Sequence, residues 1–287
     1  MSSDLICYKK MPEWTATTLP EGFQTKHNTQ AGTWAKLTIF SGELRFYLLD
    51  DDGNVLSEHV YDKEHQPPML EPQVWHKVKP ETSDLRCQLS FYCDKSVFYT
   101  KKYALTATHS EVVAASKIIA PCKTLDLGCG RGRNSLYLDS LGFNVTSCDQ
   151  NQLSIDFLRN VIKEEKLNIN TYVYDINNAD IQENYDFILS TVVMMFLNRD
   201  RLPMIINNMQ EHTNVGGYNL IVVALDTKDY PCTIGFSSPF QSQELANYYK
   251  DWELIKYNED IGELHRTDAN GNRIKLRFAT MLAKKIK

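Results

Sequence analysis

An alternation of strand-length and helix-length segments begins near Tyr103 and limits the rest of the chain to a few folds. Short apolar runs predict buried strands, and longer segments with apolar residues three or four positions apart predict amphipathic helices. Strands that alternate with helices predict a mainly parallel sheet with helices on both faces. The predicted segments are 124–127, 134–140, 144–148, 153–164, 171–173, 185–190, 202–212 and 218–224.

The region before this alternation has a different pattern. Turn-forming residues such as Ser41-Gly42 and Gly53-Asn54 separate short segments that alternate apolar with polar residues. Such segments predict strands that bury one face, and strands joined by short turns predict a small sandwich or barrel. The predicted strands are 33–40, 43–49, 55–61 and 85–91.

The two patterns predict two domains. We expect a small β-barrel domain over residues 1–95, a linker over residues 94–102, and an α/β domain over residues 96–287. The first helix of the second domain is expected to begin at Thr108, because Thr108 and Glu111 have the spacing of a capping box. The predicted fold class is therefore α/β, preceded by a small all-β domain.

Charge and cysteine content narrow the class of protein. The chain has 287 residues and a formal net charge of −5, whereas broad contact with nucleic-acid phosphates requires a basic face. Its seven cysteines contain no CxxC pair and follow no signal peptide. This pattern predicts reduced thiols in a cytoplasmic protein without a zinc site. The longest apolar run, 220–225, is too short to span a bilayer.

A glycine-rich segment joins the first predicted strand of the α/β domain to the next helix. Gly128 and Gly130 leave room for a ligand beside the backbone, and the helix N-terminus offers free N–H groups. A dinucleotide-binding turn would place its third glycine where Arg133 stands, but here the third glycine is Gly132. Asp126 opens the segment, and its negative charge favours a ligand with a cationic end over a pyrophosphate.

Two further carboxylates follow the next two predicted strands. Asp149 lies about 20 residues beyond the turn, where sheets of this type place a ribose-binding acid. Asp175 ends the third strand, although Asn177 and Asn178 also fit an ordinary turn. The carboxyl ends of parallel strands face one crevice, so we expect these acids to line a ligand site.

The glycine-rich segment followed by these two acids resembles the class I S-adenosylmethionine-dependent methyltransferases. The resemblance implies that Gly128 and Gly130 face the amino-acid part of S-adenosylmethionine. It also implies that Asp149 binds the ribose hydroxyls and that Asp175, with the backbone of Ile176, holds the adenine. The expected cofactor-binding residues are Tyr103, Asp126, Gly128, Cys129, Gly130, Asn134, Asp149, Gln150, Asp175, Ile176 and Thr191.

A hairpin near the C-terminus collects positive side chains. Asn270-Gly271 is a strong hairpin turn and would bring His265, Arg266 and Arg273 close together. Two guanidinium groups and an imidazole suit a compact oxyanion. From the spacing alone, a solvated hairpin tip with surface arginines is the alternative interpretation.

Four segments, 105–111, 190–197, 229–233 and 262–273, carry a closer resemblance. Through them, the chain from about Tyr103 to its end resembles the TehB family of bacterial tellurite-resistance methyltransferases. The resemblance implies methyl transfer from S-adenosylmethionine to tellurite, and to selenite as a related oxyanion. Arg266 and Arg273 would orient the oxyanion, His265 would help to orient or deprotonate it, and no metal is expected. The expected partner is this small oxyanion, with a possible homodimer, and neither nucleic-acid binding nor membrane insertion is expected.

The N-terminal region resembles the cupin-like β-barrel domain of longer TehB proteins. Shorter family members lack that domain, so we expect methyl transfer not to require it. Cupin metal sites use clustered histidines, but His59, His65 and His76 are dispersed in this chain. Trp75 and His76 would either line an anion or regulatory pocket or serve as structural residues of the barrel.

Three alternative functions stay open at this point. The acceptor could be another small nucleophile, such as a thiol. The chain could instead be a non-catalytic sensor that binds S-adenosylmethionine and signals through its β domain. Finally, Cys129 or Cys232 could reduce tellurium, although neither has a neighbouring cysteine to resolve the oxidised thiol.

Overall fold

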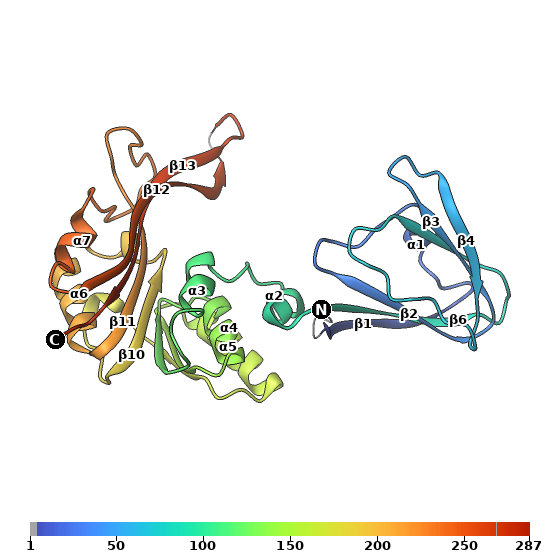
Figure 1. Ribbon diagram of the computed structural model, residues 1–287, viewed down its shortest axis with the longest axis horizontal. Helices are drawn as coiled ribbons and strands as arrows, with labels where there is room; N and C mark the ends of the chain where they lie inside the picture. Colours follow the sequence, from blue (N-terminus) through green and yellow to red (C-terminus); the bar gives the residue numbers. More distant parts are fainter. Residues whose placement is uncertain (1–4, 268) are drawn as a thin grey trace. The chain divides into compact units, whose positions relative to one another are not determined.

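The computed structural model of the chain describes residues 5–267 and 269–287, with the side chains of His265 and Arg266 outside the described part. It consists of two compact units, Met1–Ala104 and Leu105–Lys287 (Figure 1). The sequence analysis placed the boundary between residues 95 and 96. Each unit is described below by itself.

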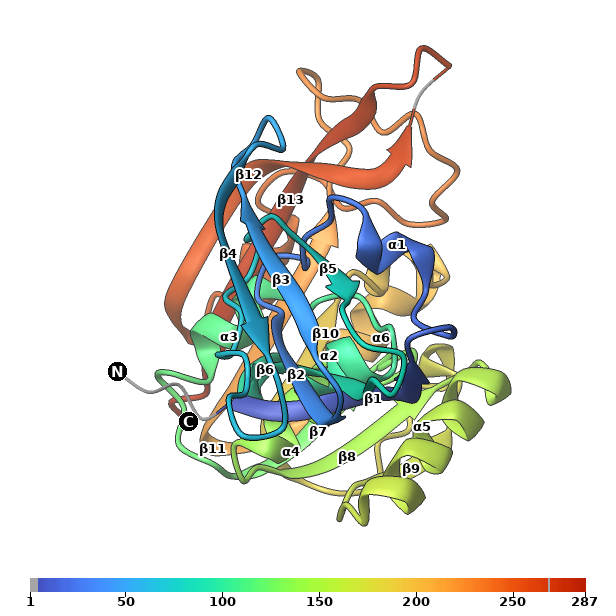
Figure 2. The ribbon, with the colours of Figure 1, turned by 90° about the vertical axis from the view of Figure 1, so that its right-hand side faces the viewer.

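The first unit contains two three-stranded antiparallel sheets, ordered β1-β6-β2 and β4-β3-β5 (Figure 2). Four of these strands agree with predicted segments, whereas β1 and β5 were not predicted. In β1 the exposed Lys10 and Glu13 interrupt the apolar pattern, and β5 is only five residues long and carries Lys77 and Lys79. The strands are β1 (Leu5–Thr15), β2 (Trp34–Ser41), β3 (Leu44–Leu49), β4 (Val55–Tyr61), β5 (His76–Pro80) and β6 (Arg86–Asp94), and a short helix, α1 (Glu21–Gln24), follows β1.

The segment predicted as a linker is helical. It forms η1 (Lys95–Val97) and α2 (Phe98–Lys102). Asp94 starts this turn, because its carboxylate accepts hydrogen bonds from the Ser96 amide at 2.9 Å and the Ser96 hydroxyl at 2.7 Å. The helix α2 contacts β1 and β6, and it therefore belongs to the first unit.

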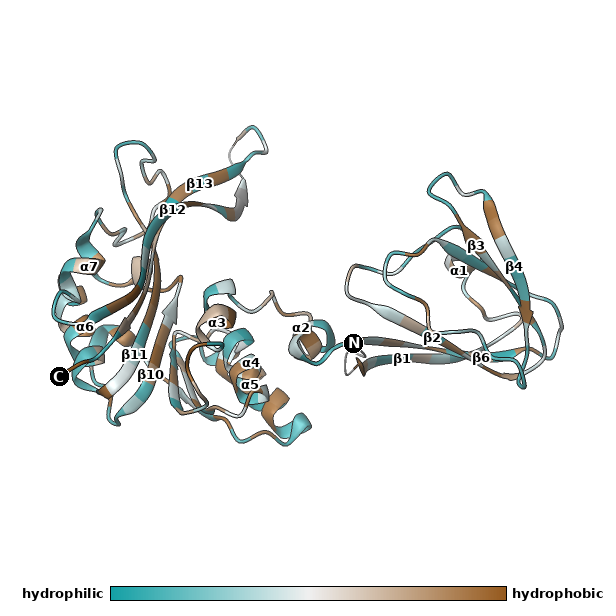
Figure 3. Cartoon of the chain, in the orientation of Figure 1, coloured by the Kyte–Doolittle hydropathy of each residue, from teal (hydrophilic) through white to brown (hydrophobic). Residues whose placement is uncertain are grey.

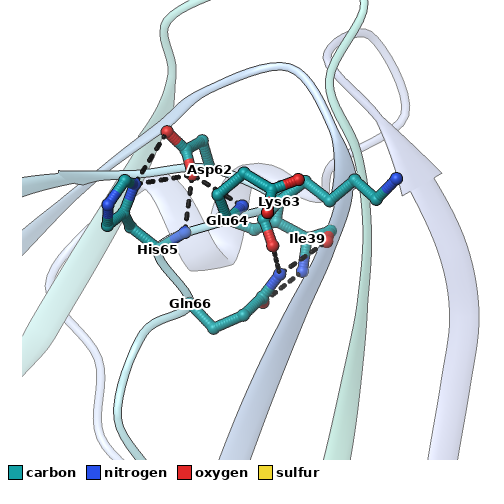
Figure 4. A network of polar contacts seen from close by, with 6 residues as sticks. All are labelled: Ile39, Asp62, Lys63, Glu64, His65 and Gln66. Atoms are coloured by element: carbon teal, nitrogen blue, oxygen red, sulfur yellow. Dashed lines mark hydrogen bonds and ion pairs between the residues drawn. The ribbon is translucent and has the colours of Figure 1, made fainter.

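Polar contacts close the turn after β4 (Figure 4). The carboxylate of Asp62 accepts hydrogen bonds from the backbone amides of Glu64 and His65 at 2.8 and 2.6 Å. Gln66 accepts a hydrogen bond from the Ile39 amide at 2.8 Å and donates one to the Ile39 carbonyl at 2.7 Å. The Gln66 side chain therefore pairs with the edge strand β2 as a neighbouring strand would.

The histidines considered as metal ligands are separated in the structure. His59 lies on β4, His65 lies in the exposed turn that follows β4, and His76 is buried on β5. Over the described residues, no group of three or more His, Cys, Asp or Glu side chains is arranged to hold a metal ion.

The second unit is built on one seven-stranded sheet, ordered β12-β13-β11-β10-β7-β8-β9. The five strands from β11 to β9 in this order pair in parallel, and β13 runs antiparallel to both β11 and β12. This sheet confirms the predicted α/β class. Its strands are β7 (Lys123–Leu127), β8 (Asn144–Asp149), β9 (Asn170–Val173), β10 (Tyr185–Thr191), β11 (Thr213–Ala224), β12 (Glu253–Thr267) and β13 (Arg273–Lys284).

Helices cover both faces of this sheet, with α3, α4 and α5 on one face and α6 and α7 on the other (Figure 1). The central strands are apolar along much of their length (Figure 3), and Leu125, Ile188 and Ile221 are completely buried. In the described part of the chain, no helix is both long enough and apolar enough to cross a membrane. The helices are α3 (Ser110–Ala115), α4 (Arg133–Ser140), α5 (Gln152–Glu165), α6 (Leu202–Glu211) and α7 (Glu244–Tyr248), with short turns at η2 (Ile176–Asn178), η3 (Met194–Phe196) and η4 (Arg199–Arg201).

The start of α3 differs from the predicted capping box. The N-cap is His109, whose Nδ1 accepts a hydrogen bond from the Glu111 amide at 3.2 Å. Thr108 instead donates its hydroxyl to the carbonyl of Arg133 at 3.3 Å. The first turn of α3 is thereby attached to the first turn of α4.

The hairpin of β12 and β13 projects past the edge where the parallel strands end (Figure 1). The pairing of β13 with β11 stops at Phe278, whereas its pairing with β12 continues to Arg273. The loops after β7, β8, β9 and β10 meet at that same edge, because parallel strands end on one side of a sheet. The hairpin therefore stands beside the edge at which a ligand crevice is expected.

We expect a fragment that starts at Leu105 to fold without the first unit. The second unit has a complete sheet and its own buried core, so its stability should not depend on the other unit. Circular dichroism of the fragment should show one cooperative thermal transition that coincides with a transition of the full chain. A fragment that melts gradually, without a cooperative transition, would contradict this expectation.

Candidate active site

The turn between β7 and α4 depends on its glycines. Gly128, Gly130 and Gly132 all have positive φ angles, of 83°, 54° and 85°. A Cβ atom on Gly128 would lie 2.6 Å from the side chain of Val193, and one on Gly132 would lie 2.6 Å from Leu158. A Cβ atom on Gly130 would meet nothing within 4 Å. The outer two glycines therefore pack the turn against the protein, and the middle one faces open space that a ligand can use.

Asp149, the last residue of β8, holds this turn from the next strand. Its Oδ2 accepts a hydrogen bond from the Gly130 amide at 2.9 Å, and its Oδ1 accepts one from the Asn151 amide at 2.8 Å. Each carboxylate oxygen can accept more than one hydrogen bond. Asp149 can therefore position the turn and also accept hydrogen bonds from ligand hydroxyls.

Asp126 lies beneath the glycine turn rather than on its surface. The residue is 1% exposed, and its Oδ2 accepts a hydrogen bond from the Ser135 hydroxyl at 2.6 Å. Burial raises the pKa of Asp126 to about 6, although the Ser135 hydrogen bond and the charge of Arg133 act in the opposite direction. Asp126 thus joins β7 to α4, and its attraction for a cationic ligand group stays a prediction.

Asn134 connects three segments at the base of the site. Its Nδ2 donates to the hydroxyl of Thr191 at 3.0 Å, and its Oδ1 accepts a hydrogen bond from the His109 amide at 3.0 Å. Asn134 and Thr191 are both buried. This network fixes the end of β10 and the start of α3 relative to the glycine turn.

Asp175 makes local turn contacts after β9. Its Oδ1 accepts hydrogen bonds from the Asn177 amide at 3.0 Å and from the Asn177 side chain at 2.9 Å. Ile176 is buried in the core of the unit. Both the ordinary-turn interpretation and the adenine-binding prediction are compatible with this geometry.

Three further residues were predicted to bind the cofactor. Gln150 is exposed directly after β8. Cys129 is buried in the glycine turn, where its thiol donates to the Gly130 carbonyl at 3.4 Å. Tyr103 is the C-cap of α2 and belongs to the first unit. The assignment of these three residues to the cofactor stays a prediction.

A pocket of about 520 Å³ lies among α3, the first residue of α4, the end of β10 and the β12–β13 hairpin. Apolar residues form part of its wall, and both positive and negative side chains face it. The charged and titratable residues that line it are His109, Glu111, Arg133, Lys256, Asp260 and Glu263.

Val192 lines this pocket with an uncommon backbone conformation. Its φ angle is 61°, in the left-handed region that β-branched residues rarely adopt. Its amide donates to the Val222 carbonyl at 2.7 Å, which holds the residue in place. Backbone strain of this kind concentrates at functional sites.

Arg133 contributes an unneutralised guanidinium to the pocket. Its Nη1 donates to the Thr106 hydroxyl at 3.3 Å and to the Ala107 carbonyl at 3.2 Å, and no described carboxylate forms an ion pair with it. Burial lowers the pKa of Arg133, while Asp126 raises it. An arginine stays protonated under these conditions, so Arg133 brings to the pocket a positive charge that is in no ion pair with a described residue, although Asp260 and Glu263 line the same pocket.

His109 and Lys256 add two further donors to the pocket. Because Nδ1 of His109 accepts the Glu111 amide hydrogen bond, the proton of the neutral ring is on Nε2. Burial and the charge of Arg133 lower the pKa of His109, so the ring is neutral at pH 7. The ammonium of Lys256 lies 2.6 Å from the carboxylate of Glu111, and this charge is therefore already paired.

The hairpin residues predicted to grip an oxyanion are only partly described. The side chains of His265 and Arg266 lie outside the described residues. Arg273 begins β13 opposite Thr267, is exposed, and is absent from the lining of the pocket. The role of these three side chains stays a prediction.

Arg277 attaches the hairpin to the loop between β11 and α7. Its Nη2 and Nε donate to the carboxylate of Asp229 at 2.6 and 2.8 Å, and its Nη1 donates to the Glu259 carbonyl at 2.7 Å. Hydrogen bonds from Arg277 and then Thr227 lower the pKa of Asp229 to about 2. Unlike Arg133, this guanidinium already has a counter-ion.

Cys129 and Cys232 are poorly suited to redox chemistry. All seven are free thiols, and burial raises the pKa of both Cys129 and Cys232. Thiolate is the reactive form, so a raised pKa reduces reactivity. This electrostatic environment argues against the hypothesis of thiol reduction of tellurium.

Sequence reasoning did not identify Arg133, His109 and Lys256 as pocket residues. Arg133 was noted only because it stands where a dinucleotide-binding turn has glycine. Its place as the first residue of α4 was a usable signal, because such a residue lies next to the ligand side of a glycine turn. Lys256 carried no local signal, since it comes from a strand far away in the sequence.

Comparison with known proteins relates the whole chain to one family. A family model described as tellurite resistance protein TehB matches residues 91–282, and one described as a TehB-like domain matches residues 9–89. The "probable S-adenosyl-L-methionine-dependent methyltransferase TehB" of Haemophilus influenzae strain Rd is 60% identical over 285 residues, which cover 99% of this chain and 100% of that protein.

One solved structure and one further protein are similar over most of the chain. The crystal structure of TehB from Haemophilus influenzae superposes with a TM-score of 0.92 at 60% sequence identity, covering 99% of this chain and 100% of the other. A protein of Eikenella corrodens named hemagglutinin 1 is 48% identical over 237 residues, which cover 83% of this chain and 79% of that protein. The similarity in structure therefore extends over both units.

We expect Asp126→Asn to stabilise the ligand-free protein at pH 8. The folded-state pKa of Asp126, about 6, lies above the ordinary value for Asp, so folding takes up a proton between about pH 4 and 6. The stabilising contribution of this carboxyl group is therefore lost as the pH rises through that window. Asparagine does not titrate, so its contribution to stability does not change over this range. The thermal midpoint of Asp126→Asn minus that of the wild type should therefore grow from pH 4 to 6 and then level off.

Asp251→Asn provides the matched control, because Asp251 is exposed and the substitution removes the same charge. Its thermal midpoint should follow that of the wild type at every pH. A destabilised Asp126→Asn at pH 8 would show instead that the ionised carboxylate stabilises the turn.

Proposed function

Because this chain belongs to the TehB family and is an S-adenosylmethionine-dependent methyltransferase, we propose that its methyl acceptor is the tellurite oxyanion, with selenite as a second acceptor. Methylation of tellurite would convert a toxic anion into a different chemical form and so confer resistance. The description of the family and the positive charge of Arg133 support this choice.

The residues at the strand ends fit S-adenosylmethionine. When bound, this cofactor supplies an electrophilic methyl group on a sulfonium centre. We expect Asp149 to accept hydrogen bonds from the ribose hydroxyls, and the open face of Gly130 to admit the amino-acid part. Asp175 and the backbone of Ile176 would hold the adenine, and Thr191 would line the sulfonium side.

The unpaired guanidinium of Arg133 carries the proposal of an oxyanion acceptor. A partly desolvated guanidinium binds oxyanions well, because its N–H groups can donate two parallel hydrogen bonds. The Nε2–H of neutral His109 would supply another donor. From the hairpin, Arg266 and Arg273 would complete the grip, and His265 would help to orient or deprotonate the anion.

The proposed reaction is a single displacement. The lone pair on tellurium(IV) would form a carbon–tellurium bond as the carbon–sulfur bond of the bound donor breaks. The electrons of that bond would stay on sulfur, so the second product would be S-adenosylhomocysteine. The protein would contribute mainly by aligning the acceptor with the methyl group, which is catalysis by proximity and orientation.

The proposed setting is a reducing cytoplasm, in which the seven free thiols would stay reduced. The proposal gives the β-sheets of the first unit no part in methyl transfer, so a fragment that starts at Asp94, and therefore keeps Tyr103, should retain activity. It requires no nucleic-acid or membrane partner, and it is compatible with a homodimer.

We expect S-adenosylhomocysteine to form only when tellurite or selenite is present. Arg133→Met should lower kcat/KM for tellurite by at least about tenfold, since losing a charged hydrogen bond costs roughly 1.5–3 kcal/mol. Arg133→Lys should recover only part of the rate, because a point charge cannot donate two parallel hydrogen bonds. The measurements are steady-state turnover and, separately, cofactor affinity by calorimetry.

The hairpin is tested in the same assay. Arg266→Ala and Arg273→Ala should lower tellurite turnover while cofactor affinity stays nearly unchanged, and His265→Ala should shift the pH profile if the imidazole acts as a base. Arg159→Met, on the exposed face of α5, is the matched control and should keep the wild-type rate.

The same assay distinguishes the alternative functions. Cofactor binding without turnover on any oxyanion would favour a non-catalytic sensor of S-adenosylmethionine. Turnover on thiols alone would favour a methyltransferase for that other small nucleophile.

We expect Asp149→Ala to weaken S-adenosylmethionine binding by about ten- to over a hundredfold. The substitution removes the carboxylate that would accept the ribose hydrogen bonds, each worth roughly 1.5–3 kcal/mol, and it also releases the Gly130 amide. Asp156→Ala, at a half-exposed position on α5, should bind the cofactor like the wild type. Equal affinities for the two variants, measured by calorimetry, would remove Asp149 from the cofactor site.

A further inference from the structure

The first unit encloses a cavity that the methyltransferase reaction does not use. Its volume is about 400 Å³, and all of its lining residues come from residues 8–101. Sites for small molecules typically have volumes of about 300–1,000 Å³. Trp14, Phe23, Phe46 and Phe91 give the cavity an aromatic wall. The space is therefore suited to a small ligand with an apolar body.

Two histidines face each other in this cavity. The ring centroids of His27 and His76 are 4.0 Å apart, and His76 stacks on Phe46 with an interplanar angle of 7° and a centroid distance of 5.4 Å. Nδ1 of His27 lies 2.9 Å from the Thr25 carbonyl, and Nδ1 of His76 lies 2.9 Å from the Val74 carbonyl. A carbonyl only accepts, so both rings carry a proton on Nδ1.

Both imidazoles are therefore acceptors on their other nitrogen. Burial lowers the pKa of His27, and burial lowers the pKa of His76 to about 4, so both rings are neutral at pH 7. Neither Nε2 atom has a hydrogen-bond partner among the residues that the structure describes. Two residues that line the cavity thus each have an Nε2 lone pair that can accept a hydrogen bond from a ligand.

A lysine supplies a hydrogen-bond donor to the same cavity. The ammonium of Lys101, on α2, donates to the Thr33 hydroxyl at 2.9 Å and to the Ala31 carbonyl at 3.1 Å. An ammonium has three donors, so one N–H is left for a ligand. Lys9 also lines the cavity, and no Asp or Glu does. The electrostatic environment of the cavity therefore favours an anion.

We propose that this cavity binds a small aromatic carboxylate that carries a hydroxyl or amino donor. The carboxylate would pair with Lys101, the ring would lie against the aromatic wall, and the donor would bond to Nε2 of His27 or His76. The set of groups disfavours a metal ion, because only two imidazoles are available and two lysines add positive charge. Trp75 does not line the cavity, since its Nε1 donates to Asp51 at 2.9 Å.

Hydroxybenzoate isomers are suitable probes for the full-length protein. Their affinities can be compared with those of the matching hydroxybenzamides and hydroxybenzylamines, which keep the ring and hydroxyl but change the charge. Isothermal calorimetry measures binding, and the fluorescence of Trp14 in the cavity wall provides a second signal. We expect the best acid to bind at least about tenfold more tightly than its amide, because the amide loses the charged hydrogen bond to Lys101.

Substitutions of cavity residues test whether the probes bind in this cavity. Lys101→Met should weaken binding of the acid at least about tenfold and leave that of the amide nearly unchanged. His27→Phe should weaken both, because it fills space and removes one acceptor. Lys79→Met is the matched control, since Lys79 is exposed on β5, next in sequence to the cavity residue Val78, and it should bind like the wild type.

Circular dichroism and the thermal midpoint of each variant without probe establish that it is folded. The comparison of acid, amide and amine on the wild-type protein needs no variant, so the proposal can be tested even if one substitution prevents folding. Three results would each overturn it: no binding of any acid at millimolar concentration, equal binding of acid and amine, or acid binding that survives both Lys101→Met and His27→Phe.

Discussion

The hydrogen bonds from the Gly130 and Asn151 amides to Asp149 are the contacts on which the candidate active site depends. They join the turn after β7 to the end of β8, and these two strands are parallel neighbours in the sheet. Since parallel strands end at one edge, a single carboxylate can reach both loops. Asn134 acts similarly between α4, β10 and the start of α3. The proposed cofactor contacts and Arg133 are positioned by these two polar links.

Much of the α/β fold could be predicted because its central strands bury both faces. A strand such as β10 is buried along nearly its whole length and contains the apolar run Phe187, Ile188 and Leu189, so the pattern is visible without any knowledge of its neighbours. The missed strands β1 and β5 are both at sheet edges, where one face is wet and pairing depends on a distant partner. Likewise, the segment of η1 and α2 is helical because of local capping and its packing on β1 and β6, which composition alone does not indicate.

Candidate site residues that lie close together in the sequence could be predicted. Pocket residues that only the fold brings together could not. Asp126, Gly128, Gly130 and Asp149 belong to a short motif and to the strand after it, and they meet at one turn. The pocket beside them combines residues that are far apart along the chain. The ion pair of Lys256 with Glu111 spans 145 residues, and no spacing rule connects such positions. Burial of Asp126 and the left-handed backbone of Val192 are likewise properties of the folded chain.

The ion pair between Arg277 and Asp229 holds the loop beside the hairpin. The order of this loop should therefore depend on the salt concentration and not on the pH. Asp229 has a pKa of about 2, so the pair keeps its charges over the whole physiological range of pH. Its side chains are 30% and 51% exposed, however, and dissolved ions can reach both of them. The Debye length falls from about 8 Å at physiological salt to about 3 Å at 1 M. Rising salt would therefore loosen the attachment of this loop to the hairpin while the interior contacts of the sheet stay intact.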